Sequence, residues 1–188
     1  MRKFILCAPL WLMVVATCGQ AQTTGIRKDP LSVYLRDAYT LNRNFIAKAA
    51  EKMPEQYYGM RPGSQMEVRT FAQLVGHLVN YNYLVCSDAK GEKNPNQGND
   101  FEKQTSKAVL VKGINDAFVY CDAVYAALTD ASGMEGVHGT AQKDGGRPVV
   151  LRVSRLIFNY AHNNEHYGNM VTYMRIKNIV PPSSDPGR

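Results

Sequence analysis

SRLIFNYAHNNEHYGNMVTYMRIK, residues 154–177, is the stretch that decides the fold. It predicts a helix from about Ser154 to about Lys177, because its residues recur at helical spacing and Pro181-Pro182 forbids continuation. Five side chains fall along one strip of this helix: Phe158, His162, His166, Asn169 and Tyr173. The strip therefore carries two histidines on one face, a single turn apart.

Three further segments show helical periodicity between stretches rich in Gly, Pro, Asn and Asp. We expect these helices over three ranges: 30–52, 70–88 and 106–129. Asp29 and Pro30 suit the N-cap and first position of the first helix. Thr70 and Gln73 have capping-box spacing at the start of the second. Gly113 is a weak point within the third, because glycine disfavours a helix interior.

Apolar seams indicate which face of each of these helices meets the core. The expected seams are Leu31, Leu35, Ala38, Phe45 and Ala49; Phe71, Leu74, Leu78, Tyr81 and Val85; and Val109, Ile114, Ala117, Cys121, Val124 and Leu128. The connections 89–105 and 131–150 are longer than ordinary bundle turns, which favours crossovers. No alternation is long enough to build a sheet, although Gly145-Gly146 before Arg147-Pro148 is compatible with a small turn or hairpin. We therefore expect an all-α four-helix bundle with long connecting loops.

The N-terminus has the pattern of a secretory signal peptide. Arg2 and Lys3 precede an apolar run that is shorter than the roughly 20 residues of a membrane span, and small residues follow it. We expect cleavage after Ala21, which gives a signal peptide over 1–21, one domain over 22–188 and no stable membrane span. Lipidation at Cys18 is the less favoured alternative, because Thr17 fits poorly before a lipidated cysteine.

Export bears on the cysteines, since Cys86 and Cys121 remain after cleavage. An oxidising compartment would allow them to pair, and two buried reduced thiols are an equally good interpretation. The formal net charge falls from +6 to +4 when Arg2 and Lys3 are removed. The remaining cations are interleaved with acids and neutral residues, so we expect no nucleic-acid partner.

The histidines carry the main functional signal. His162 and His166 lie at i and i+4, and His77 lies on the second predicted helix. If the two helices are neighbours, three imidazoles meet with coordination positions left open, which is the arrangement of a catalytic metal. Burial between helices strengthens this interpretation, because unpaired imidazoles would lose hydrogen bonds there that a metal could replace.

The segment 162–166 also matches the H-x-x-E-H pattern of certain zinc proteases. We reject that function, because such proteases need a further ligand well downstream and the sole acid after His166 is Asp185 in a Pro-rich tail. Glu165 stays a candidate for proton transfer or for a hydrogen bond to a metal ligand. An ordinary acid on the helix surface is an equal alternative for it.

Other polar residues have weaker signals. His138 is a minor candidate for a fourth ligand, in a glycine-rich loop. Tyr167 and Tyr173 could close over the site, but packing is favoured. Arg61 and Arg69 bracket the start of the second helix and could meet an anionic substrate, although surface salt bridges are the default for them.

These motifs together resemble the DinB-like superfamily over almost all of the mature chain. The residues that carry the resemblance are 58–62 (YGMRP), 69–78 (RTFAQLVGHL), 162–175 (HNNEHYGNMVTYMR) and 179–183 (IVPPS). The resemblance implies an up-down-down-up bundle that binds a divalent ion, zinc or nickel, through His77, His162 and His166. Similar proteins include thiol-dependent S-transferases and isomerases. The export signal departs from the well-described cytoplasmic members, which puts a cytoplasmic thiol cosubstrate in doubt.

We therefore expect an exported protein, periplasmic or extracellular, that binds a divalent metal. The alternative is a metal-dependent enzyme, either a thiol S-transferase or a hydrolase of a small substrate. The sequence leaves open the identity of the ion, a small-molecule substrate and a homodimer.

Overall fold

The computed structural model describes residues 28–139 and 145–186. The predicted signal peptide over 1–21, with Cys18, lies outside these residues. Within them no helix combines the length and apolar character needed to cross a bilayer.

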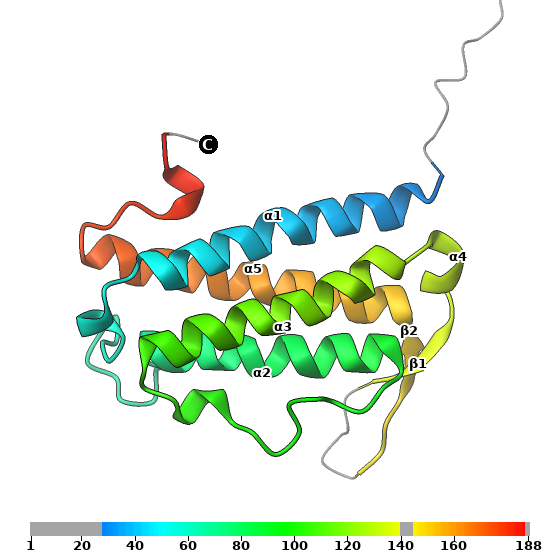
Figure 1. Cartoon of the computed structure of the whole chain (residues 1–188), viewed down its shortest axis with the longest axis horizontal. Helices are drawn as coiled ribbons and strands as arrows, with labels where there is room; N and C mark the ends of the chain where they lie inside the picture. Colours follow the sequence, from blue (N-terminus) through cyan, green and yellow to red (C-terminus); the bar gives the residue numbers. More distant parts are fainter. Residues whose placement is uncertain (1–27, 140–144, 187–188) are drawn as a thin grey trace, which may run out of the picture.

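Four long helices form the bundle, as the sequence predicted (Figure 1). They are α1 (Pro30–Lys52), α2 (Phe71–Lys90), α3 (Lys107–Ala127) and α5 (Arg152–Ile176). In Figure 1, α2 and α3 run in the same direction, and the polar linker between them returns along the side of the bundle. The helices therefore follow the predicted up-down-down-up order, and the long 89–105 connection is the crossover.

The smaller elements lie in the connections. They are the 3-10 turns η1 (Glu55–Tyr57), η2 (Phe101–Lys103) and η3 (Pro182–Ser184), the short helix α4 (Asp130–Gly133), and the strands β1 (Gly136–His138) and β2 (Val149–Leu151). The strands pair antiparallel, with Val137 opposite Val150. The structure thus adds a two-stranded ribbon that the sequence left as an undefined turn or hairpin.

The start of α1 differs from the expected cap. Asp29 has a left-handed backbone and its side chain does not cap its own helix. Instead the carboxylate of Asp130 accepts hydrogen bonds from the Leu31 and Ser32 N–H groups, at 3.3 and 2.8 Å. Asp29 in turn accepts from the Asp130 N–H at 3.0 Å. The two aspartates therefore cap each other's helices, a reciprocal contact across a long sequence separation. At α2 the predicted Thr70–Gln73 capping box is present.

The predicted seam of α1 and the predicted strip of α5 coincide only in part with the faces that are buried. Leu31 and Phe158 are exposed, at 47% and 45%. The buried positions of α1 include Ser32, Tyr39 and Asn42 beside Leu35 and Ile46, and those of α5 include Asn159 and Asn163 beside Leu156 and Met170. Amides in the core explain the difference, because a hydrophobic pattern assigns such residues to the surface.

A layer of fully buried amides crosses the bundle between α2 and α5. Asn82 and Asn163 exchange two hydrogen bonds, at 2.9 and 3.0 Å, and Asn159 donates to Asn82 at 3.2 Å. Asn159 also contacts the hydroxyl of Tyr125, which donates to the Leu156 carbonyl. Reciprocal pairing lets buried amides meet most of their hydrogen-bonding capacity.

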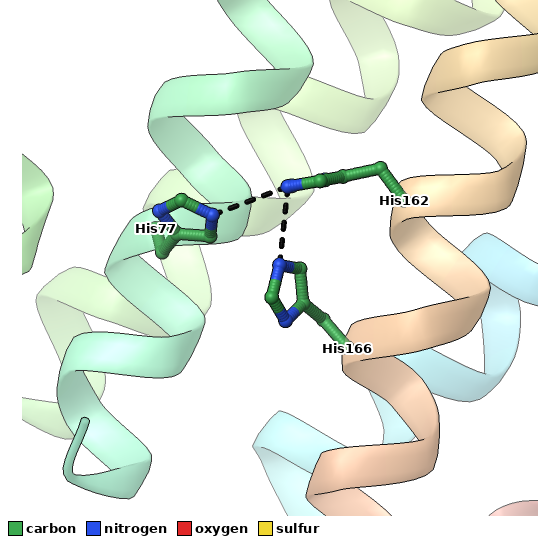
Figure 2. Close-up of side chains that lie close together, drawn as sticks. All are labelled: His77, His162 and His166. Atoms are coloured by element: carbon green, nitrogen blue, oxygen red, sulfur yellow. Dashed lines mark hydrogen bonds between the residues drawn. The ribbon is translucent and has the colours of Figure 1, made fainter. Parts of the chain in front are cut away.

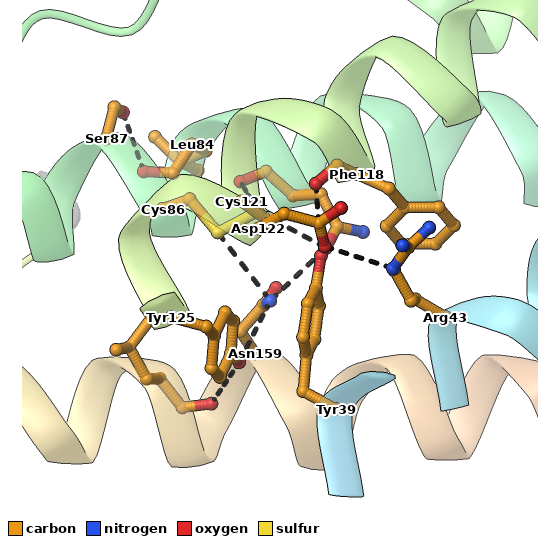
Figure 3. Close-up of a disulfide and its surroundings, with 12 residues drawn as sticks. Tyr39, Arg43, Leu84, Cys86, Ser87, Phe118, Cys121, Asp122, Tyr125 and Asn159 are labelled. Carbon is orange, nitrogen blue, oxygen red and sulfur yellow. Dashed lines mark hydrogen bonds and ion pairs between the residues drawn. A yellow bond between two sulfur atoms is a disulfide. The ribbon is translucent and has the colours of Figure 1, made fainter. Parts of the chain in front are cut away.

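Against this amide layer lies a disulfide between Cys86 and Cys121, which joins α2 to α3 (Figure 3). Both residues are fully buried. The Sγ of Cys121 is 3.3 Å from the Asn82 carbonyl oxygen, and the Sγ of Cys86 is 3.8 Å from the Asn159 amide nitrogen. Of the two interpretations that the sequence left open, the structure has the pair joined.

Candidate metal centre

His77 on α2 meets His162 and His166 on α5 (Figure 2). The Nε2 atom of His162 lies 3.2 Å from Nε2 of His77 and 3.1 Å from Nε2 of His166. All three candidate ligand atoms lie within 4.8 Å of one another. His77 and His166 are buried and His162 is partly buried. The structure thus brings together the three histidines that the spacing singled out.

The spacing of these nitrogens fits a divalent ion. Imidazole nitrogens bind zinc at about 2.0–2.1 Å, so neighbouring ligand nitrogens around one ion stand about 3.0–3.4 Å apart. Both short separations fall in that range, and the third lies within 4.8 Å. Three Nε2 atoms that converge on one point cannot all hydrogen-bond one another, because a neutral ring has a single donor. A cation at that point would satisfy all three lone pairs.

A carboxylate that the sequence did not reveal completes the surroundings of His77. Oε1 of Glu102, in η2, lies 2.7 Å from His77 Nδ1, and Arg69 Nε donates to Glu102 Oε2 at 2.9 Å. A carboxylate accepts, so Nδ1 of His77 carries the proton and Nε2 keeps its lone pair toward the other imidazoles. Glu102 thereby fixes the ring tautomer that suits metal binding.

Two glycines let Glu102 approach α2. A Cβ on Gly76 would lie 2.2 Å from the Phe101 carbonyl oxygen, and one on Gly113 would lie 2.5 Å from the Phe101 ring. Gly113 was expected to be a weak point of its helix, and it is instead the buried contact that receives Phe101. Asn80 secures the same segment by accepting from the Phe101 N–H at 3.1 Å. The linker is therefore packed onto the site.

The rings of the other two histidines are held differently. His162 stacks on Tyr81, with ring centroids 4.3 Å apart, and its buried Nδ1 has no hydrogen-bond partner among the described residues. The amide nitrogen Nδ2 of Asn169 lies 3.4 Å from His166 Nδ1 and donates to it as placed, and a half-turn of the amide group would present the oxygen to an Nδ1 proton instead. Packing orients the first ring and a side-chain amide orients the second.

The electrostatics favour neutral imidazoles. Burial, together with the neighbouring His166 and His77, lowers the pKa of His162 to about 3. Burial and His77 lower the pKa of His166 to about 4. Burial also lowers the pKa of His77, against the opposing hydrogen bond to Glu102. At neutral pH all three rings are therefore uncharged, the form that binds a metal.

A cavity of about 270 Å³ opens beside His166, and Arg69, Asn169 and Tyr173 are among its lining residues. No fourth side chain of the described residues joins the three histidines as a candidate ligand. The cluster thus consists of three imidazoles, and the cavity beside it is large enough for a small molecule.

The remaining candidates lie outside the cluster or act indirectly. Glu165 and His138 are exposed and do not belong to it. Tyr167 packs on Phe45 with ring centroids 5.4 Å apart, as favoured, and accepts from the Ser183 N–H. Tyr173 lines the cavity and donates its hydroxyl proton to the Arg69 carbonyl.

The two arginines also have defined partners. Arg61 donates to the Val68 carbonyl at 2.7 Å, which orders the segment before α2. Arg69 forms a salt bridge, the default expected for it, but its partner is Glu102 of the site. Arg69 therefore lines the cavity, and Arg61 bonds to Val68, another of its lining residues.

Comparison with known proteins identifies relatives of this fold. The family described as the DinB superfamily matches residues 38–170. No curated protein sequence matches the chain.

Solved structures share the architecture at low sequence identity. A DinB-like protein from Bacillus cereus is 14% identical with a TM-score of 0.60, and the alignment covers 79% of this chain and 93% of that one. The mycothiol-dependent maleylpyruvate isomerase is 12% identical with a TM-score of 0.57, over 74% of this chain and 60% of the isomerase. These likenesses show the fold.

A third neighbour is the colibactin self-resistance protein ClbS, solved in complex with double-stranded DNA. It is 17% identical with a TM-score of 0.55, and the alignment covers 77% of this chain and 95% of ClbS. At this identity the complex says nothing about the ligands of the present chain. That this chain has no nucleic-acid partner stays a prediction.

Proposed function

The chain belongs to the DinB superfamily, and from its three converging imidazoles we propose that it is a divalent-metal-binding protein with His77, His162 and His166 as the ligands. The observation that carries the proposal is that His162 Nε2 lies 3.2 Å from His77 Nε2 and 3.1 Å from His166 Nε2, separations that suit one shared ion. Neutral imidazole is a ligand for zinc and nickel alike, and these are the two ions we propose.

Elemental analysis tests this proposal most directly. The protein is purified without a polyhistidine tag, and we expect about one zinc or nickel per chain. The His77→Ala variant should lose the ion, because two ligands hold a divalent ion far less tightly than three. A wild-type protein that binds neither ion, also after dialysis against each, would contradict the proposal.

A second candidate function is a metal-dependent enzyme that acts on a small molecule. It is favoured by the cavity beside His166 and by the lack of a fourth ligand among the described residues, since a purely structural ion is usually enclosed by four. When bound, the ion would supply a Lewis acid toward a donor group such as a water or a thiol. The chain's own residues orient the imidazoles, and Arg69, Asn169 and Tyr173 present polar groups to the cavity.

Thiol transfer and ester hydrolysis are the reactions to screen, the first because one structural neighbour is a mycothiol-dependent isomerase. Wild type is compared with His162→Ala in each assay. Turnover that survives the loss of His162 would arise from a contaminant or from another site. If no substrate turns over while the ion is bound, the binding function stands and the enzyme is excluded for those substrate classes.

We propose in addition that the protein is exported, with cleavage after Ala21. The Cys86–Cys121 disulfide supports this, because disulfides persist in oxidising compartments. The mature protein recovered from a periplasmic or secreted fraction should begin at Gln22. A mass that includes residues 1–21, or a lipid on Cys18, would contradict it.

A further inference from the structure

The cavity beside His166 has two chemically different walls. Its polar side chains include Arg69, Asn169 and Thr172. Its apolar side includes Val68 and Leu74. A volume of about 270 Å³ suits a ligand of a few carbon atoms, since one water occupies about 30 Å³ of liquid. The shape therefore favours a small molecule with one polar end and one apolar end.

The charges around this cavity favour an anion. Arg69 lines it, and the guanidinium groups of Arg61 and Arg69 act to lower the pKa of Tyr173, against the burial that raises it. Glu102 offsets one of these charges through its pair with Arg69. Glu67 also lines the cavity but is exposed to solvent, where its charge is screened.

A bound dication would add to the positive charge beside the cavity. Three neutral imidazoles contribute no charge, and Glu102, the carboxylate of the described residues that bonds to the cluster, is already paired with Arg69. Glu165 also acts on His77 and His166, but from an exposed position where its charge is screened. A partly buried site with two uncompensated positive charges attracts an anionic ligand. This step rests on the metal-binding function proposed above, whereas the cavity and its arginine do not.

We propose that the cavity is a binding site for a small aliphatic monocarboxylate, whose carboxylate pairs with Arg69 and whose alkyl end lies against Val68 and Leu74. A guanidinium offers two edges to planar anions, so Arg69 can hold a ligand carboxylate on one side while it pairs with Glu102 on the other. The ligand stands next to His166. Carboxylate and dication then strengthen each other's binding, and the coupling is reciprocal.

Calorimetric titration with butyrate tests the site, with butyramide as the uncharged ligand of the same shape. Both are titrated into the nickel-loaded and the metal-free protein. We expect butyrate to bind at least about tenfold more tightly than butyramide in the nickel-loaded form, as one charge-assisted pair allows. Nickel should in turn bind more tightly in the presence of butyrate.

Two variants separate the cavity from other places where a carboxylate could bind. Arg69→Gln removes the charge and should abolish the preference for butyrate. Thr172→Phe, at an exposed position that lines the cavity, adds bulk there while the three histidines and Glu102 are unchanged, and should abolish butyrate binding while nickel affinity is kept. Arg36→Gln, on α1 and with a side chain that is 41% exposed, is the matched control and should bind butyrate as wild type does.

The outcomes distinguish this proposal from the metal-binding function. If no ion binds, the metal-binding function fails, and the metal-free titrations still decide whether the cavity prefers butyrate. Equal binding of butyrate and butyramide overturns the carboxylate site. So does a butyrate affinity that survives both Arg69→Gln and Thr172→Phe, because the carboxylate would then sit elsewhere, for example on the ion alone.

Discussion

The bundle contains two polar clusters between α2 and α5, and their buried polar groups are satisfied in different ways. The amides of Asn82, Asn159 and Asn163 bond mainly to one another. The imidazoles of His77, His162 and His166 instead direct their Nε2 atoms at a common point, where the single N–H group of each neutral ring cannot satisfy every pair. Apart from Asn159 Oδ1, which has no hydrogen-bond partner among the described residues, the amides satisfy one another, whereas a shared cation would satisfy the imidazoles. A buried polar cluster therefore indicates a ligand when its lone pairs converge, not merely because it is polar.

The largest effect we expect is on the amide side of this comparison. The double change Cys86→Ala with Cys121→Ala should lower the free energy of unfolding by about 3–4 kcal/mol, because it frees a loop with a sequence separation of 35 residues in the unfolded chain. Denaturant titration of the metal-free protein measures it. Nickel affinity should change by less than about threefold, since neither sulfur contacts the histidines. A large loss of affinity would show that the two clusters are not independent.

Two adjacent residues sharpen the comparison. His162→Ala should weaken nickel binding by about a hundredfold or more, because it removes the ligand that contacts both other imidazoles. Asn163→Ala should instead lower the free energy of unfolding by about 2 kcal/mol, since it leaves the buried amide of Asn82 short of partners. Calorimetry measures the nickel affinity of each variant, and denaturant titration measures the free energy of unfolding of each. The reverse pattern would refute the division of roles.

A smaller effect is expected at Glu102, which acts on the site through His77. Glu102→Gln should weaken nickel binding by about tenfold, because an amide is a poorer acceptor for the Nδ1 proton than a carboxylate. The absorption bands of the cobalt-loaded protein should shift, a change that loss of stability alone would not produce. Lys103→Gln, at the next and exposed position, is the control. An unchanged spectrum and affinity would place Glu102 outside the function of the site.

The smallest effect concerns pH in the metal-free protein. The pKa of His166 is lowered to about 4, so the unfolded chain takes up a proton there between about pH 6.5 and 4 while the folded chain does not. Folded stability is therefore lost as the pH falls through this window. Between pH 7.5 and 6 one such histidine contributes about 0.8 kcal/mol. His166→Gln should flatten the pH dependence of unfolding by that amount, and an unaltered slope would contradict the assignment.

The bundle and the pair His162 and His166 were predictable because each rests on a pattern within one segment, whereas His77 joined the pair only on the condition that the two helices are neighbours and through the family resemblance. Helical periodicity defined the four long helices to within a few residues, and the i, i+4 spacing placed His162 and His166 together. The predicted strip of α5 differs from the face that is buried, because Asn159 and Asn163 are fully buried. Amides in a core depend on partners from another helix, and a single segment does not show these.

Glu102 and the Asp29–Asp130 caps were not predictable, since both depend on contacts between distant segments. One signal for Glu102 was present in the sequence. Gly76 and Gly113 each cost helix stability, and two such residues on neighbouring helices indicate that something packs closely there. The sequence does not show that the residue packed against both glycines is Phe101.

The close seat of Phe101 on Gly76 has a consequence for protein engineering. Copying the three histidines onto a bundle made of uninterrupted alanine- and leucine-rich helices would not reproduce their environment, because any methyl group at position 76 collides with the incoming main chain. A successful graft must carry the glycine, the crossover segment and its glutamate as one inseparable unit. The α2 half of this centre is thus a helix together with the loop that leaves it, and it has to be paired with the α5 segment that carries His162 and His166.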